Sequence, residues 1–136
     1  MIVDSSALVA VLMAEPDAAE IGRLLEAGPF SLSAATLTEC MIVLRGKGGE
    51  EKALALDELL DATGASIVPL DEEQARLATR AYVRYGRGSG SRARLNYGDC
   101  FSYALAITRD EPLLFTGDDF IHTDVRRVES AEPVVD

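Results

Sequence analysis

The stretch IVDSSALVAVL, residues 2–12, sets a single acid between two apolar elements. Its first two residues are typical of a short buried strand, and its second half is apolar enough for a buried helix that ends near residue 13. We expect Ser5 to cap this helix, because a serine hydroxyl commonly accepts a hydrogen bond from the first N–H groups of a helix. Asp4 therefore lies where a strand ends and a helix begins.

The same alternation of strand and helix continues along the chain. Further strands are expected at 30–33, 66–70 and 112–116, a marginal one at 126–130, and helices at 16–27, 34–45, 50–63, 71–85 and 97–109, the last capped by Asn96. This order predicts an α/β fold with a mostly parallel central sheet. A length of 136 residues predicts one domain that spans 1–136.

Composition excludes several classes of protein. The chain has 23 acidic and 13 basic residues, and its formal charge of −10 argues against sequence-blind binding to nucleic acid. No run reaches the roughly 20 apolar residues that span a membrane, and the N-terminal run lacks the basic start of a secretory signal. Cys40 and Cys100 lie in apolar helical patterns, which favours reduced thiols in a cytoplasmic protein. His122 is the only histidine, so a zinc site of the common Cys/His kind is excluded.

Acidic residues follow two of the expected strands. Asp4 comes directly after the first strand, and the pair Asp118 and Asp119 follows the strand that ends at 116. Ligands of parallel α/β sheets bind at the carboxyl ends of the strands, near the point where strand order reverses, so these acids are expected at one edge. Asp99 lies in the first turn of the last helix, an end that can face the same edge.

Glu39 differs from the other acids because it lies on a partly apolar face of a helix. Its neighbours three and four residues away include no base; they are Ala35, Thr36, Ile42 and Val43. Such a carboxylate either has a raised pKa or is compensated by a charge from outside its helix. A divalent cation with oxygen ligands would supply that charge.

Each acid also has a structural explanation that involves no ligand. Asp99 can be a first-turn acid that the helix dipole favours, and Asp4 can cap its own helix. Asp118 and Asp119 can be turn residues after a glycine. Glu39 can be solvated at the rim of its helix. One shared site is the more economical hypothesis, because it accounts for all of these positions at once.

The acids lie in stretches that resemble the PIN-domain ribonucleases, specifically the VapC toxins of bacterial toxin–antitoxin pairs. These stretches are IVDSSALVAVL (2–12), TLTE (36–39), LNYGDCFSYALA (95–106) and LLFTGDDF (113–120). The resemblance covers nearly the whole chain in the right order. It implies a PIN-like three-layer α/β/α sandwich and an endoribonuclease that hydrolyses RNA phosphodiester bonds with Mg²⁺ or Mn²⁺. It also implies a VapB-type antitoxin as inhibitor and a tendency to form a homodimer.

The resemblance further assigns roles to individual residues. Metal binding falls to the acids singled out above, which are Asp4, Asp99, Glu39 and, as the fourth acid, Asp118 or else Asp119. Ser6 resembles the small hydroxyl that orients the first carboxylate through a hydrogen bond. The chemistry agrees, because hard dications prefer carboxylate and water oxygens and can activate a water molecule without a histidine.

Arginines gather beside the expected acid site. The nineteen residues from 80 to 98 contain five arginines and no acid. An acidic pocket repels RNA, so we expect Arg87, Arg92 and Arg94 to hold phosphates and deliver the strand to the metal. The alternative is a solvated loop and helix end without a binding role.

Two other α/β families gather acids at strand ends but fit this chain less well. A receiver-type domain needs an acid pair after its first strand and a late lysine, whereas the only lysines here are Lys47 and Lys52. A haloacid-dehalogenase-type phosphatase needs a second Asp at the position of Ser6. The remaining alternative is a catalytically inactive PIN-like domain that binds an antitoxin or a nucleic acid.

Overall fold

Strands and helices alternate through residues 1–129, which are the residues that the computed structural model describes. In chain order the elements are β1 (Ile2–Val3), α1 (Ser5–Leu12), α2 (Ala18–Ala27), β2 (Ser31–Ser33), α3 (Ala34–Gly48), α4 (Glu50–Thr63), β3 (Ser66–Val68), α5 (Glu72–Tyr85), α6 (Asp99–Arg109) and β4 (Leu113–Leu114). The expected order of elements is confirmed.

The strands form one parallel sheet in the order β3-β2-β1-β4. Ile2 of β1 aligns with Ser31 of β2 on one side and with Leu113 of β4 on the other. The chain thus moves outward from β1 to β3 and then returns to the other side of β1. The strand order reverses between β1 and β4, and such a reversal point is where parallel α/β sheets bind ligands.

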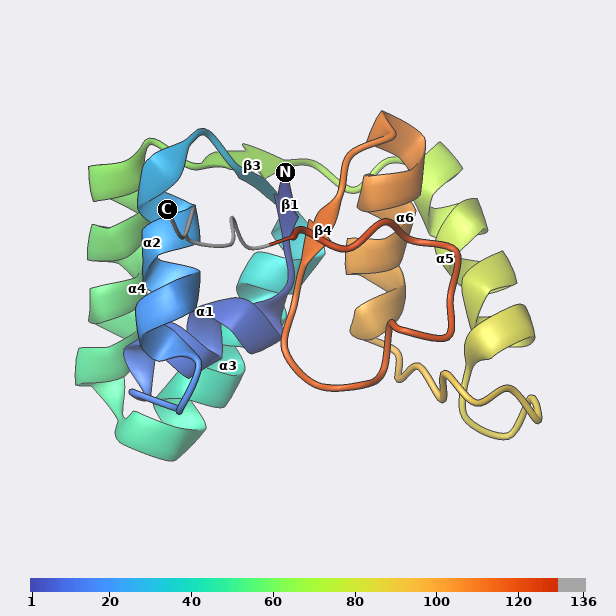
Figure 1. Ribbon diagram of the computed structural model, residues 1–136, viewed down its shortest axis with the longest axis horizontal. Helices are drawn as coiled ribbons and strands as arrows, with labels where there is room; N and C mark the ends of the chain where they lie inside the picture. The colour runs from blue at the N-terminus through green and yellow to red at the C-terminus, as the bar shows by residue number, and fades with distance from the viewer. Residues whose placement is uncertain (130–136) are drawn as a thin grey trace, which may run out of the picture.

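Helices cover both faces of the sheet. Because side chains alternate along a strand, Ile2 and Leu113 pack with α5 and α6, whereas Val3 and Leu114 pack with α1 to α4. Figure 1 shows α1, α2, α3 and α4 on one side of β1 and β4, and α5 and α6 on the other. This arrangement confirms the three-layer α/β/α sandwich.

The first helix begins differently from the expectation. Asp4 is the N-cap of α1, and its Oδ2 accepts a hydrogen bond from the N–H of Ser6 at 3.1 Å. The prediction that Ser5 caps this helix is wrong, because Ser5 is already its first residue. The strand therefore passes directly into the helix through the acid that follows it.

The last helix begins at Asp99, later than the expected start at 97. Asn96 still has a capping role, since its Oδ1 accepts a hydrogen bond from the N–H of Asp99 at 2.9 Å. In return, Oδ2 of Asp99 accepts one from the N–H of Asn96, also at 2.9 Å. This reciprocal pair resembles a capping box and holds Asp99 at the start of α6.

Two other helix boundaries were predicted incorrectly. The helix expected from 16 begins at Ala18, because Pro16 lies in a turn that is closed by the N–H of Ala18 and the carbonyl of Glu15 at 2.9 Å. Helix α3 continues past its expected end at 45 as far as Gly48. It ends at Gly49, whose φ of +77° is a conformation that glycine adopts readily.

The marginal strand expected at 126–130 is reduced to a single bridge within the described part of the chain. Arg127 pairs with Leu113 of β4 in a parallel bridge, and the N–H of Val128 donates to the carbonyl of Leu113 at 3.0 Å. Ser130 and the remainder of the expected 1–136 domain lie outside the described residues.

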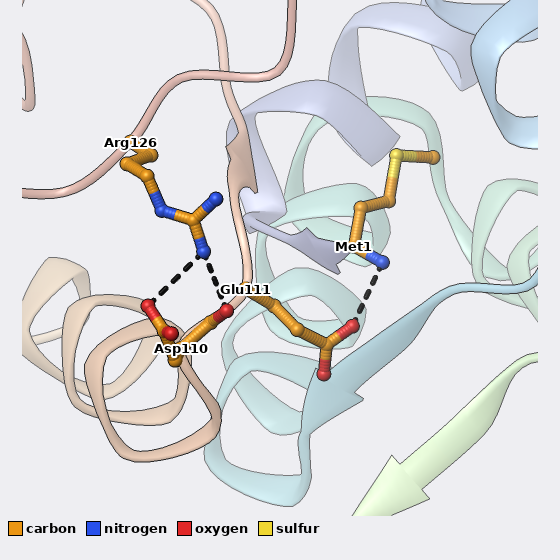
Figure 2. Close-up of polar contacts among 4 residues, drawn as sticks. All are labelled: Met1, Asp110, Glu111 and Arg126. Carbon is orange, nitrogen blue, oxygen red and sulfur yellow. Dashed lines mark hydrogen bonds and ion pairs between the residues drawn. The ribbon is translucent and has the colours of Figure 1, made fainter.

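Two polar contacts lie at the amino ends of β1 and β4 (Figure 2). The terminal amino group of Met1 contacts Glu111 at 3.0 Å, and the guanidinium of Arg126 contacts the carboxylate of Asp110 at 3.1 Å. Arg126 also donates to the carbonyl of Asp110. These contacts tie the segment between α6 and β4 to the start of the chain and to the segment that follows β4.

Two expectations drawn from composition were tested by the structure. Cys40 and Cys100 are free and buried. Burial raises the pKa of Cys40 to about 12 and that of Cys100 to about 11, so both thiols are protonated and unreactive at neutral pH. None of the helices described in residues 1–129 is both long and apolar enough to cross a bilayer.

Candidate metal centre

Asp4 and the segment that follows β4 meet at the reversal point of the sheet. The N–H of Asp4 donates to the carbonyl of Leu114 at 3.0 Å, and the N–H of Thr116 donates to Oγ of Ser6 at 3.1 Å. In Figure 1 the starts of α1 and α6 and the orange segment after β4 lie at the same end of the molecule. This is the edge at which the sequence predicted an acid site.

The carboxylate of Asp4 is buried and accepts hydrogen bonds at both oxygens. Only 2% of Asp4 is exposed. Oδ2 accepts from the N–H of Ser6 at 3.1 Å, and Oδ1 accepts from the hydroxyl of Ser102 at 2.6 Å. Ser6 thus contacts Asp4 through its backbone, while its hydroxyl accepts from Thr116. The orientation of the Asp4 carboxylate is therefore held at both of its oxygens.

Glu39 reaches this edge from α3. Its Oε1 accepts a hydrogen bond from the hydroxyl of Ser5 at 2.6 Å. Its carboxylate also lies directly against the backbone of Gly98, because a Cβ added to Gly98 would be 1.6 Å from Oε2 of Glu39. The absence of a side chain at position 98 therefore allows Glu39 to approach the start of α6.

Asp99 lies at the first position of α6 and is 7% exposed. Burial is the largest influence on its carboxyl group and raises its pKa to about 7, although the hydrogen bond from the N–H of Asn96 acts in the opposite direction. Negative charges on neighbouring carboxylates raise the pKa of Asp99 further; these belong to Asp4, Asp119 and Glu39. The structure therefore brings acids from three other segments close enough to act on the charge of Asp99.

The two acids after β4 are placed differently with respect to Asp99. Both Asp118 and Asp119 are exposed. The charge of Asp119 contributes to the raised pKa of Asp99, and that of Asp118 is not among the contributions. Of the two alternatives that the sequence left open, Asp119 is the one whose charge acts on Asp99.

The donor set fits a hard divalent cation in its chemistry. The converging side chains offer carboxylate oxygens, and none of the ion pairs recorded in residues 1–129 involves Asp4, Glu39 or Asp99. Oδ1 of Asp99 and Oε2 of Glu39 accept no hydrogen bond within this range. In their present side-chain positions, however, no three His, Cys, Asp or Glu residues of the described chain form a ready metal-binding group.

The arginine-rich loop lies beyond the start of α6, at the same end of the molecule (Figure 1). Arg87, Arg92 and Arg94 are all exposed, and none of the ion pairs recorded in residues 1–129 involves them. The two ends of the loop are joined by hydrogen bonds between its flanks, from the N–H of Arg87 to the carbonyl of Leu95 at 3.0 Å and from the N–H of Leu95 to the carbonyl of Tyr85 at 2.8 Å. Within the described residues, the loop therefore presents three positive charges that form no ion pair.

Comparison with known proteins agrees with this fold. The model of the PIN domain family matches residues 1–126. The chain belongs to the PIN-domain family. Ribonuclease VapC28 of Mycobacterium tuberculosis is 52% identical to this PIN domain over 128 residues, which are 93% of this chain and 96% of that protein.

Two solved structures share the PIN fold. VapC20 of Mycobacterium tuberculosis, described as a toxin that cleaves the sarcin-ricin loop, superposes with a TM-score of 0.77 at 18% identity and covers 93% of this chain and 97% of that one. A toxin–antitoxin complex from Klebsiella pneumoniae gives a TM-score of 0.63 at 20% identity, with 90% and 92% coverage. At these identities the likeness establishes the fold alone.

Sequence reasoning missed three residues of this PIN-domain site. Ser5 contacts Glu39, Ser102 contacts Asp4, and Gly98 makes room for Glu39. A signal existed for Ser102, because it is a small polar residue inside the apolar run FSYALA and lies three residues after Asp99. Ser5 was instead interpreted as a helix cap, and Gly98 was placed inside the helix expected at 97–109 without a role of its own.

The raised pKa of Asp99 predicts that the metal-free PIN domain loses stability as the pH rises. An unfolded Asp releases its proton near pH 3.8, whereas folded Asp99 keeps it up to about pH 7. Between these two pH values the folded state holds a proton that the unfolded state has released. The stabilisation of the folded state by this proton is complete below pH 3.8 and is lost as the pH rises through 7. The loss is on the order of 4 kcal/mol in the free energy of unfolding.

The measurement is urea unfolding in EDTA between pH 4 and 8, with wild type and Asp99→Asn side by side. The difference between the two proteins isolates Asp99 from the other titrating groups. A difference that does not change with pH would contradict the prediction.

Proposed function

We propose that this PIN domain is a metal-dependent endoribonuclease that acts as the toxin of a type II toxin–antitoxin pair. The observation that carries the proposal is the convergence of Asp4, Glu39 and Asp99 at the reversal point of the sheet, where burial and neighbouring negative charges raise the pKa of Asp99. The 52% identity to a protein named ribonuclease VapC28 supports RNA as the substrate.

Mg²⁺ or Mn²⁺ would be held by the converging acids, which are Asp4, Glu39, Asp99 and, as the fourth, Asp119 in preference to Asp118. When bound, such an ion activates a water molecule as the nucleophile and stabilises the charge that develops on the phosphate oxygens. Ligand carboxylates must be ionised, and the Asp4 carboxylate accepts hydrogen bonds from two donors. Asp99 loses its proton near neutral pH.

The exposed arginines supply the second part of the proposed activity. Arg87, Arg92 and Arg94 are exposed on the loop that leads into α6, and positive side chains of this kind are suited to hold the RNA backbone. Replacing all three with Ala is expected to weaken RNA binding for every sequence. It should also flatten the slope of log affinity against log salt by about 2, because each phosphate contact with a single strand contributes about 0.7.

The measurement is fluorescence anisotropy of a labelled single-stranded RNA across a salt series, in EDTA to prevent cleavage. A matched control removes three exposed arginines elsewhere, at Arg23, Arg45 and Arg76. This control changes the net charge equally and isolates the effect of the loop. If RNA affinity and salt slope fall equally in both triple variants, the loss is explained by net charge alone, and the proposed role of the loop in RNA binding is wrong.

A VapB-type antitoxin is the proposed inhibitor. The fold shared with the toxin–antitoxin complex from Klebsiella pneumoniae supports such a partner.

We further propose a homodimer. Exposed apolar residues support a homodimer, because such patches commonly mark a protein interface. They surround two adjoining hollows of about 420 and 410 Å³. These residues include Ile42, Leu70, Tyr82, Val83 and Tyr97. The buried reduced thiols agree with a cytoplasmic location.

The test of the proposed activity is incubation of a labelled total-RNA pool with purified, antitoxin-free protein in Mg²⁺, Mn²⁺ or EDTA. Discrete cuts that require a metal support the endoribonuclease and begin to identify its target. If folded protein makes no cut in either metal, the alternative of a catalytically inactive domain that binds an antitoxin or a nucleic acid is favoured.

A further inference from the structure

A chain of buried hydroxyl groups ends on Asp4. The hydroxyls of Thr36 and Ser102 lie 3.1 Å apart, and the hydroxyl of Ser102 contacts Oδ1 of Asp4 at 2.6 Å. These residues are 1%, 0% and 2% exposed, respectively. Because buried polar groups are costly unless they are hydrogen-bonded, each member of the chain depends on the next.

The donors and acceptors in this chain have only one consistent order. A serine hydroxyl has one hydrogen, and an ionised carboxylate can only accept. Ser102 therefore donates its hydrogen to Asp4, and Thr36 must donate to the oxygen of Ser102. Consecutive hydrogen bonds of one direction polarise each other, so Thr36 strengthens the bond that Ser102 makes to Asp4.

The chain also joins the elements that carry the other acids. Thr36 precedes Glu39 by three residues in α3, and Ser102 follows Asp99 by three residues in α6. Residues three apart lie on the same side of a helix. The two hydrogen bonds of this chain therefore connect the helix of Glu39, the helix of Asp99 and the end of β1, where Asp4 lies.

We propose that Ser102, supported by Thr36, is a positioning residue that holds the Asp4 carboxylate in the orientation needed to bind the metal ion. The inference rests on the proposed function, because it gives Asp4 a role as metal ligand. With Ser102 bound to Oδ1 and the N–H of Ser6 bound to Oδ2, the carboxylate cannot rotate freely. Partners that orient a metal ligand in this way typically contribute roughly 10- to 100-fold to metal affinity.

The direct test is the affinity of Ser102→Ala for Mn²⁺, measured by calorimetry on RNA-free protein. We expect a loss of about tenfold or more relative to wild type. The matched control is Ser33→Ala, because Ser33 is also 0% exposed and its hydroxyl also accepts a hydrogen bond, from the N–H of Ala35 at 3.1 Å. This control loses stability without losing Mn²⁺ affinity, which separates positioning from a general structural role.

Thr36→Val provides a second test that conserves side-chain shape and leaves the bond from Ser102 to Asp4 in place. We expect a smaller loss of Mn²⁺ affinity than in Ser102→Ala, and none in Thr38→Val, since Thr38 is exposed in the same helix and bonds only to the carbonyl of Ala34. If Ser102→Ala does not fold, the comparison of the two threonine variants decides the inference.

The outcomes separate this inference from the proposed function. If wild type binds Mn²⁺, Asp99→Asn does not, and Ser102→Ala and Thr36→Val both bind as tightly as wild type, the inference about Ser102 is overturned and the metal site stands. If folded wild-type protein does not bind Mn²⁺ at all, the proposed metal site is overturned together with the inference.

Discussion

Cleavage of RNA by Asp99→Asn is expected to be at least about 100-fold slower than cleavage by wild type in Mg²⁺ or Mn²⁺. Partners that merely orient a ligand contribute roughly 10- to 100-fold, so loss of a ligand's own charge has a larger effect. Asparagine keeps the size of the side chain, and its oxygen can still accept the hydrogen bond from the N–H of Asn96. The variant also avoids the cost of a buried charge, so it should be folded and at least as stable as wild type at pH 8.

The experiment compares rates on one labelled RNA in Mn²⁺, with thermal unfolding of each protein as the check on folding. Asp57→Asn is the matched control, because Asp57 is exposed on α4 and undergoes the same chemical change. It should cleave at the wild-type rate. Undiminished cleavage by folded Asp99→Asn would place the active site elsewhere.

Gly98→Ala is expected to slow cleavage by roughly 10- to 100-fold while the protein remains folded, because displacing a reacting group by about 1 Å can have such an effect. The backbone of Gly98, with φ −64° and ψ −38°, suits alanine. The added methyl group, however, would overlap the carboxylate of Glu39, whose Oε2 lies 1.6 Å from the new carbon. Glu39 must then turn away from the start of α6.

Gly46→Ala is the control for this substitution. Gly46 lies inside α3, and a Cβ there would meet no atom within 4 Å. The control should cleave normally and gain up to about 1 kcal/mol in stability, because alanine is the better helix former. Mn²⁺ affinity and cleavage rate are measured for both variants. Wild-type values for Gly98→Ala would mean that Glu39 is not needed at its present position.

The order of the elements could be predicted because short apolar stretches such as IV (2–3) and PLLFT (112–116) stand between longer stretches with helical periodicity. The position of Asp4 follows from that pattern alone, and parallel strands then bring the segment after β4 to the same edge. Helix starts were less accurate, since Ser5 and its neighbour Asp4 are both good caps and the choice depends on backbone direction at the end of β1.

The remaining features of the site depend on how distant helices pack. Ser102 and Asp4 are 98 residues apart in the chain, and the approach of Glu39 to Gly98 depends on the crossing of α3 and α6. Periodicity shows that a residue is on a buried face but not which side chain it meets there. For the same reason the sequence left Asp118 and Asp119 as alternatives, because adjacent residues in a turn point in different directions.

The placement of β4 beside β1 has a consequence for synthesis of the protein. The ribosome makes β1 long before its neighbour β4, because all of α1 to α6 lies between the two strands in the chain. A nascent chain that stops before residue 99 has neither α6 nor β4, and so lacks both Asp99 and Asp119. The acids that meet at the reversal point of the sheet are therefore complete only after the residues up to Asp119 have been translated, and the proposed metal site cannot form earlier.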